Sequence, residues 1–225
     1  MTGALVVAEG LSLATQAGPV FADLTFTVPR SRLSVVVGPS GSGRSALLLA
    51  LSGRMRGLSG SLRLGQHAAT TRPRDLRRRT AIARVATLVG PEGQLTVGES
   101  MVERALIDGV QASHADAAVA EAEQVLEVTF DRDVLVDQLP AYERSLLCVA
   151  LSMVRPADLI VLDDADHSLD LAEQRRLLAA LSRLSVTGRT VLTSTTEAAA
   201  VPADANVIAL SRLRTAQPAT PNEES

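Results

Sequence analysis

Residues Gly38–Ser45 have the types and spacing that can hold a phosphate group. The segment Gly-Pro-Ser-Gly-Ser-Gly-Arg-Ser follows the pattern G-x-x-x-x-G-[K]-[ST], with Arg44 in place of the lysine. Apolar runs at 33–37 and 46–51 flank it, which predicts a strand, a turn and a helix. Its glycines let backbone N–H groups turn inward, and the helix presents the positive end of its dipole at the same place. We therefore predict a polyphosphate-binding loop in preference to an ordinary glycine-rich turn. The residues predicted to contact the phosphates are Gly38, Pro39, Ser40, Gly41, Ser42, Gly43, Arg44, Ser45 and Ala46.

Two adjacent carboxylates, Asp163 and Asp164, follow an apolar run at 159–162. Apolar strands alternating with amphipathic helices predict a parallel sheet of α/β type, and such sheets bind ligands at the carboxyl ends of their strands. The pair and the loop should therefore meet. Ser45 and Asp163 could then serve Mg²⁺ and its water shell, and Asp164 could orient or deprotonate a water. The alternative for the pair alone is a solvated strand end.

The helices and strands that must position these residues can be placed from the periodicity of apolar residues and from the residue types that begin or end such elements. Thr96 and Glu99 have the spacing of a capping box, so a helix should begin there. Gly18-Pro19 marks a turn, and Gly53 and Gly57 end the helix after the loop. The predicted strands are 4–8, 20–28, 33–37, 61–64, 82–89, 159–164, 190–194 and 206–210. Further helices are predicted at 114–128, 140–154 and 171–185. The first two of these, with the helix that begins at Thr96, form a block at about 96–154 that contains no strand.

Composition limits the function classes. The chain has 225 residues, a net charge of −3 and 2% aromatic residues, so neither its overall field nor base stacking favours nucleic acid. The single cysteine, Cys148, lies in an apolar run and is expected to be a buried hydrophobe; its lack of a partner agrees with the cytosol. No apolar run reaches 18 residues, so a membrane role requires a separate protein. An arginine-rich segment is expected to be a solvated face; it holds Arg72, Arg74, Arg77, Arg78, Arg79 and Arg84.

In the order of its motifs, nearly the whole chain resembles the ATP-binding cassette (ABC) ATPase family. The loop at 38–45 is similar to the family's Walker A motif. Residues 159–164 are similar to Walker B, and 167–170 to the S-A-L-D loop that follows it. Residues 95–100 resemble the L-T-V-x-E-N opening of the helical subdomain, and 191–197 stand at the place of the switch-histidine segment. The place of the L-S-G-G-Q-R signature is taken by Leu139, Pro140, Ala141, Tyr142, Glu143 and Arg144.

The resemblance implies a fold, a cofactor and partners. The fold would be a P-loop NTPase with a mostly parallel sheet core, an antiparallel β-subdomain and an inserted three-helix subdomain at about 96–154. Residues 1–211 would form one nucleotide-binding domain, with a disordered tail at 212–225. The chain would bind ATP with Mg²⁺ through Ser45 and Asp163, and pair with a like domain as a homodimer or heterodimer. It would also join a transmembrane transporter subunit through the region of the Q-loop and the helices at about 97–128. It would then be cytoplasmic, peripheral at the inner face of the cell membrane.

Several positions depart from the family pattern. Arg44 replaces the Walker A lysine, and its planar fork is not equivalent to a point charge. Asp164 stands at the catalytic glutamate and reaches one methylene less far. Thr196 stands at the switch histidine and cannot be a cation. At the signature, Pro140 removes a backbone donor and Tyr142 adds bulk.

Two further family positions lack their usual residues. The adenine-stacking position near Thr15 has no aromatic, and Phe21 is a distant substitute. The Q-loop glutamine could be represented by Glu92 or Gln94.

Three hypotheses follow. The first is an ATP-binding subunit of an ABC transporter whose hydrolysis is slow or impaired. The second is a non-hydrolysing pseudo-ATPase with a regulatory or scaffold role. The third is an ABC ATPase that acts on nucleic acid or ribosomes, and the single cassette, the acidic balance and the lack of a heptad run count against it.

Overall fold

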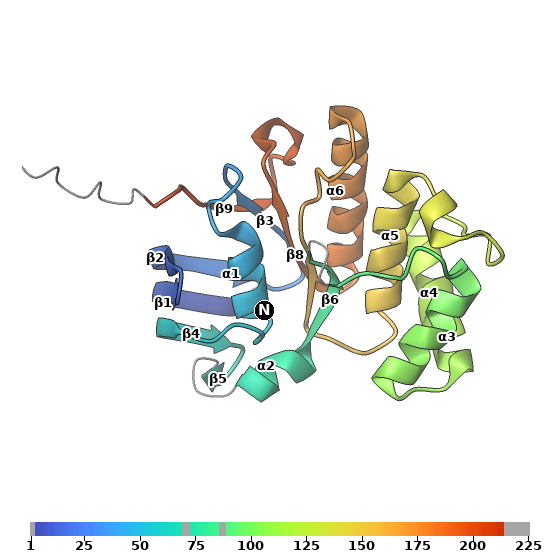
Figure 1. Cartoon of the computed structure of the whole chain (residues 1–225), viewed down its shortest axis with the longest axis horizontal. Coiled ribbons are helices and arrows are strands. Elements are labelled where there is room, and N and C mark those ends of the chain that lie inside the picture. Colours follow the sequence, from blue (N-terminus) through green and yellow to red (C-terminus); the bar gives the residue numbers. More distant parts are fainter. Residues whose placement is uncertain (1–2, 69–72, 86–88, 214–225) are drawn as a thin grey trace, which may run out of the picture.

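The computed structural model describes residues 3–68, 73–85 and 89–213. It contains two sheets and a group of helices (Figure 1). In that view the antiparallel sheet lies on the left, the parallel sheet in the middle and most of the helices on the right.

The central sheet is parallel. Its strands are β3 (Leu33–Val37), β6 (Thr80–Arg84), β7 (Leu159–Leu162), β8 (Thr190–Thr195) and β9 (Asn206–Ala209). They lie in the order β6-β7-β8-β3-β9, and every pairing in that order is parallel. The apolar runs of β3, β6, β7 and β8 are buried on both faces because helices or the second sheet cover each side, whereas the edge strand β9 exposes Val207. The parallel α/β sheet is confirmed, and the carboxyl ends of β3, β7, β8 and β9 meet at one edge.

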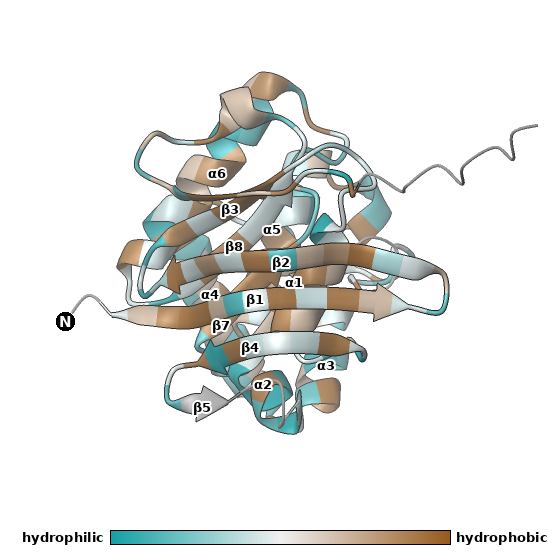
Figure 2. Cartoon of the chain, turned by 90° about the vertical axis from the view of Figure 1, so that its left-hand side faces the viewer, coloured by the Kyte–Doolittle hydropathy of each residue, from teal (hydrophilic) through white to brown (hydrophobic). Residues whose placement is uncertain are grey.

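The second sheet is antiparallel. It consists of β1 (Ala4–Thr15), β2 (Gly18–Pro29), β4 (Leu58–Leu64) and β5 (His67–Ala68), in the order β2-β1-β4-β5. Figure 2 shows β2, β1 and β4 side by side, with apolar and polar residues alternating along them. The predicted strands at 4–8, 20–28 and 61–64 exist but are longer. The predicted turn is displaced, because Gly18 already pairs with Thr15 and the turn lies at 16–17.

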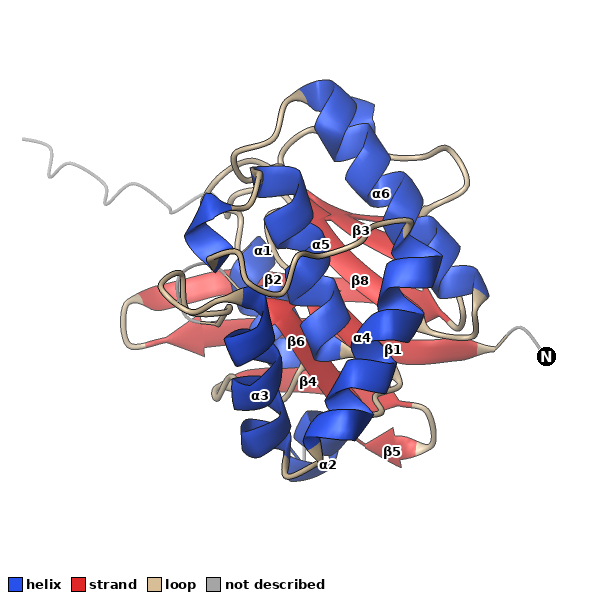
Figure 3. Ribbon diagram, turned by 90° about the vertical axis from the view of Figure 1, so that its right-hand side faces the viewer, coloured by secondary structure: helices blue, strands red, loops and turns tan. Residues whose placement is uncertain are grey.

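The helices divide between the two faces of the parallel sheet. Helix α1 (Arg44–Leu51) packs in a core shared with the antiparallel sheet. The other face is covered by α3 (Val97–Asp108), α4 (Ala112–Leu126), α5 (Ala141–Ser152) and α6 (Leu171–Val186) (Figure 3). The Thr96–Glu99 capping box is present, as predicted. Pro140 is the N-cap of α5 and not its first helical residue. Short 3₁₀ turns lie at Val136–Gln138 and Ala198–Ala200.

The arginine-rich segment differs from the expectation. Part of it forms a helix, α2 (Pro73–Arg79), which the sequence reasoning did not predict. Strand β6 then begins at Thr80 and ends at Arg84, instead of spanning 82–89; Val85 and Val89 form an isolated bridge. Arg84 is half-buried in the core and does not belong to a solvated face. Residues 86–88, Arg72 and most of the predicted tail, 214–225, lie outside the described residues.

Candidate nucleotide site

The glycine-rich loop connects the end of β3 to the start of α1. Its first glycine, Gly38, donates its N–H to the carbonyl of Thr195, which anchors the loop to β8. A Cβ on Gly38 would lie 2.5 Å from the carbonyl oxygen of Leu210, so no side chain fits there. Gly43 caps the helix at φ 91°, a left-handed conformation that favours glycine. The loop geometry therefore follows from glycines at the predicted positions.

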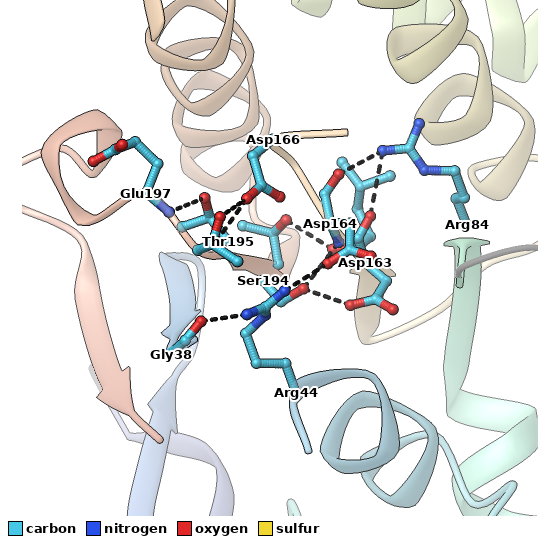
Figure 4. A network of polar contacts seen from close by, with 12 residues as sticks. Gly38, Arg44, Arg84, Asp163, Asp164, Asp166, Ser194, Thr195 and Glu197 are labelled. Carbon is cyan, nitrogen blue, oxygen red and sulfur yellow. Dashed lines mark hydrogen bonds and ion pairs between the residues drawn. The ribbon is translucent and has the colours of Figure 1, made fainter. Parts of the chain in front are cut away.

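The side chain of Arg44 is almost fully buried. It points toward Gly38 and the carboxylate of Asp164 (Figure 4). One terminal nitrogen donates to the carbonyl oxygen of Gly38, and the other lies 2.9 Å from Oδ1 of Asp164. Nε of Arg44 has no hydrogen-bond partner within the described part of the chain. All 22 basic residues of the chain are arginines, so its one phosphate-loop cation is an arginine too.

Asp163 is fully buried at the end of β7. Its Oδ1 accepts a hydrogen bond from the Ser194 hydroxyl at 2.5 Å. Burial raises the pKa of the Asp163 carboxyl, and the Asp164 charge adds to the rise, while the hydroxyls of Ser194 and Ser45 act in the opposite direction. Oδ2 has no partner among the described residues. A buried, unpaired carboxylate oxygen beside a serine hydroxyl fits a Mg²⁺ site, because this hard cation prefers oxygen ligands.

Asp164 and Asp166 are held separately. Asp164 has φ 47°, and its N–H donates to the Ser194 hydroxyl at 2.9 Å, so its carboxylate is aimed at Arg44. Asp166 accepts hydrogen bonds from both the N–H and the hydroxyl of Thr196. Thr196, at the predicted switch position, is therefore hydrogen-bonded to Asp166 in this structure.

Arg84 joins the carboxylate segment to the helices. It donates to the carbonyls of Asp163 and Asp164, and to the Ser145 hydroxyl on α5 at 3.1 Å. From the sequence, no such role was predicted for Arg84, Ser194 or Asp166. A signal was available only for Ser194, which lies at the end of a strand predicted to be parallel to β7.

A pocket of about 600 Å³ opens above the loop, a size suited to a nucleotide. Its charged lining residues are Arg44, Asp164 and Arg212, and the hairpin of β1 and β2 contributes Thr15. Phe21, the distant substitute for the adenine-stacking aromatic, does not line the pocket, because its side chain is buried against Gly43. Arg212 was missed because the domain was predicted to end at 211.

The signature segment does not line this pocket. Leu139 is buried, Pro140 is exposed, and Tyr142 stacks against the guanidinium of Arg176 at 4.5 Å. Neither candidate for the Q-loop glutamine lines the pocket; Gln94 donates to the carboxylate of Asp137 at 3.3 Å. One chain thus brings together the loop and the carboxylates, and leaves the signature positions apart.

The loop, the parallel sheet and the carboxylates at its edge define a P-loop NTPase fold. A family model described as ABC transporter matches residues 21–167 of the chain. The chain therefore belongs to the ABC transporter family, as one of its ATPase nucleotide-binding domains.

Individual relatives agree with this assignment. The cobalt import ATP-binding protein CbiO of Rhodobacter capsulatus is 31% identical over 215 residues, which are 92% of this chain and 75% of that protein. The cytochrome c biogenesis ATP-binding export protein CcmA of Xylella fastidiosa is 28% identical over 166 residues, 74% of each chain.

A solved structure shares the fold. CbiO1 from Clostridium perfringens, part of the ABC transporter complex cbiONQ, has a TM-score of 0.78 at 16% identity over 92% of this chain and 84% of that one. Within the described residues, no helix of this chain is both long enough and apolar enough to cross a membrane.

Proposed function

We propose that the chain is an ATP-binding subunit of an ABC transporter and that it binds Mg²⁺-ATP in the pocket above Gly38–Ser45. The observation that carries this proposal is the loop with Arg44 inside it, at the same sheet edge as the buried Asp163 carboxylate, which has one oxygen without a partner among the described residues. The relatives named as ATP-binding import and export proteins support the assignment. The phosphates would contact residues 38–46. Ser45 and Asp163 would hold Mg²⁺, which when bound neutralises negative charge on the phosphates.

We propose that hydrolysis is slow. Asp164 would be the general base, but its carboxylate is paired with Arg44 and so is not free to accept a proton from water. Thr196 carries no charge and is bonded to Asp166. The same two observations favour the second candidate, a pseudo-ATPase that binds nucleotide without cleaving it. Steady-state phosphate release from the purified chain, alone and with its partners, separates the two, because slow release indicates the first candidate and no release the second. Turnover like that of ordinary transporter ATPases would contradict both.

The signature segment would serve a second nucleotide-binding domain. Residues 139–143 lie outside the pocket of their own chain, which is what a site shared between two chains requires. Pro140 offers no N–H, and Tyr142 is held by Arg176, so this chain would grip the partner's nucleotide weakly. We propose a homodimer or a heterodimer on this basis.

A membrane subunit would dock beside α3. A groove of about 350 Å³ lies between Val89–Pro91 and this helix, and Ile107 lines it. The neighbouring side chains of Val102 and Leu106 are 51% and 76% exposed, an apolar surface that a partner could cover. Docking there would keep the chain in the cytoplasm, peripheral at the inner face of the cell membrane.

A nucleotide titration tests the binding proposal. Arg44→Ala should weaken Mg²⁺-ATP binding about tenfold or more, because a cation at the phosphates is lost. Arg32→Ala is the matched control, since it removes an arginine at the other end of β3, outside the pocket. Equal affinity for wild type and Arg44→Ala would show that Arg44 is not a phosphate ligand. No binding by the wild type would overturn the proposed function.

A further inference from the structure

The chain leaves β9 next to the phosphate loop. Strand β9 pairs in parallel with β3, so that Ala209 lies opposite Val37, the last residue before the loop. Leu210 continues this pairing by donating its N–H to the Val37 carbonyl at 2.8 Å, and it is buried. Because both strands end at the same edge, the residues after Leu210 must emerge at the rim of the pocket.

Arg212 lies on that rim and is attached to the loop. Its Nε donates to the Ser40 carbonyl at 2.8 Å. The same nitrogen would lie 3.9 Å from a Cβ at Gly41, an ordinary van der Waals distance, so the side chain of Arg212 lies along the glycine-rich loop. Within the described residues, its two terminal nitrogens have no hydrogen-bond or ion-pair partner. Arg212 thus presents two free donors at the mouth of the pocket.

The charges of the pocket make this position important. Arg44 and Asp164 neutralise each other through their ion pair, and Arg44 is also bonded to Gly38. Arg212 is then the unpaired cation among the charged residues that line the pocket. A nucleotide polyphosphate entering the free protein would meet Arg212 before it could draw Arg44 away from its carboxylate.

We propose that Arg212 is a second phosphate ligand and supplies at the rim the cation that the engaged Arg44 does not offer. This inference rests on the proposed nucleotide binding, whose failure would be seen in the wild type. The ligand class is the polyphosphate chain itself, and the base is not part of the contact. Anchoring of Nε on Ser40 orients the two free donors as a fork, the geometry in which arginine binds phosphate oxygens.

The test compares the full-length wild type with Arg212→Gln and Arg212→Lys by calorimetric titration with Mg²⁺-ATP and by competition with inorganic tripolyphosphate. Arg212→Gln should weaken both ligands about tenfold and flatten the salt dependence of binding. Arg212→Lys keeps the charge but loses the forked geometry of the guanidinium, so its affinity for both ligands should lie between those of the wild type and Arg212→Gln.

A matched control is Arg32→Gln. Arg32 is also exposed and also donates its Nε to a loop carbonyl, that of Asp204 at 2.9 Å, but at the other end of β3. Its substitution should leave both affinities unchanged.

Two results would overturn the proposal, and a third would refute the function on which it rests. Unchanged affinities in Arg212→Gln would overturn it. Weaker ATP binding with unchanged tripolyphosphate competition would overturn it too, because the contact would then be to the nucleoside. A wild type that binds neither ligand would instead refute the proposed function on which the inference rests.

Discussion

Nη2 of Arg44 lies 2.9 Å from Oδ1 of Asp164, so the two positions that depart from the family pattern in the loop and after β7 contact each other. The arginine is longer than a lysine and the aspartate is shorter than a glutamate by one methylene, and the two changes fit together. The pair places a carboxylate where it competes with a phosphate for the same guanidinium. We expect this competition to set the affinity of the free protein for nucleotide.

Removing the competing charge should strengthen nucleotide binding. Asp164→Asn keeps the size of the side chain but loses the ion pair, which contributes on the order of 1 kcal/mol at a partly exposed position. The affinity for Mg²⁺-ATP should therefore rise about fivefold, as measured by calorimetry. In an Arg44→Ala background the same substitution should have a smaller effect, because Arg44 is no longer there to be released. Equal gains in both backgrounds would mean that Asp164 acts by simple repulsion of the phosphates.

The contact between Thr196 and Asp166 predicts a pH-dependent effect on stability. Burial raises the pKa of Asp166, but the hydrogen bonds from Thr196 outweigh it, so the net pKa lies below the usual 3.8. Ionised Asp166 therefore stabilises the folded state above pH 3.8, and this contribution is lost as the pH falls through the folded-state pKa. Thr196→Val should lower the free energy of unfolding by about 0.5–1 kcal/mol at pH 7 and by less near pH 3, measured by urea denaturation.

The control for this prediction is Ser185→Ala, which removes a hydroxyl bonded to the neutral Leu181 carbonyl. Its effect should be the same at both pH values. A pH-independent effect of Thr196→Val as well would contradict the assigned role of Asp166.

The loop should tolerate no side chain at Gly43. Gly43 and Gly188 have similar backbone angles, φ 91° and φ 98°, so alanine is strained at both. A Cβ at Gly43 would also lie 3.1 Å from Cγ1 of Val20, whereas one at Gly188 meets nothing within 4 Å. Gly188→Ala should cost about 1 kcal/mol of unfolding free energy, and Gly43→Ala about 1–3 kcal/mol more. Equal thermal denaturation midpoints for the two variants would argue against the close packing of the loop on β2.

The thiol of Cys148 should be unreactive in the folded protein. It is 2% exposed, and burial raises its pKa to about 11, against the opposing charges of Arg84 and Arg144. At pH 8 only about one thiol in a thousand is then ionised, and the thiolate is the reactive form. Ellman's reagent should label the native chain very slowly and one thiol per chain after unfolding in guanidinium. Rapid labelling of the native protein would mean that the helical block opens readily.

Much of the fold and the centre of the site could be predicted from the sequence, because strand and loop patterns have local causes. Gly38 and Gly43 fix the loop through their own backbones, and the predicted parallel sheet brought Asp163 to the same edge. The capping box of Thr96 with Glu99 likewise needs no distant partner.

The missed residues depend on contacts made across the sheet. Arg84 is part of an arginine-rich segment, and its burial follows only from its pairing opposite Leu162 on β7. Arg212 follows the last strand, and its place at the loop depends on β9 lying beside β3. The contact of Arg44 with Asp164 joins residues 120 positions apart, and no local pattern indicates it.

Arg84 has a mechanical consequence. Arg84 donates to the backbone of the carboxylate segment on one side and to the Ser145 hydroxyl of α5 on the other, so it links the sheet edge to the helix that begins within the signature segment. A tilt of α5 must either carry Asp163 and Asp164 with it or break these bonds. As long as these bonds hold, a movement of α5 therefore moves the two carboxylates relative to the loop.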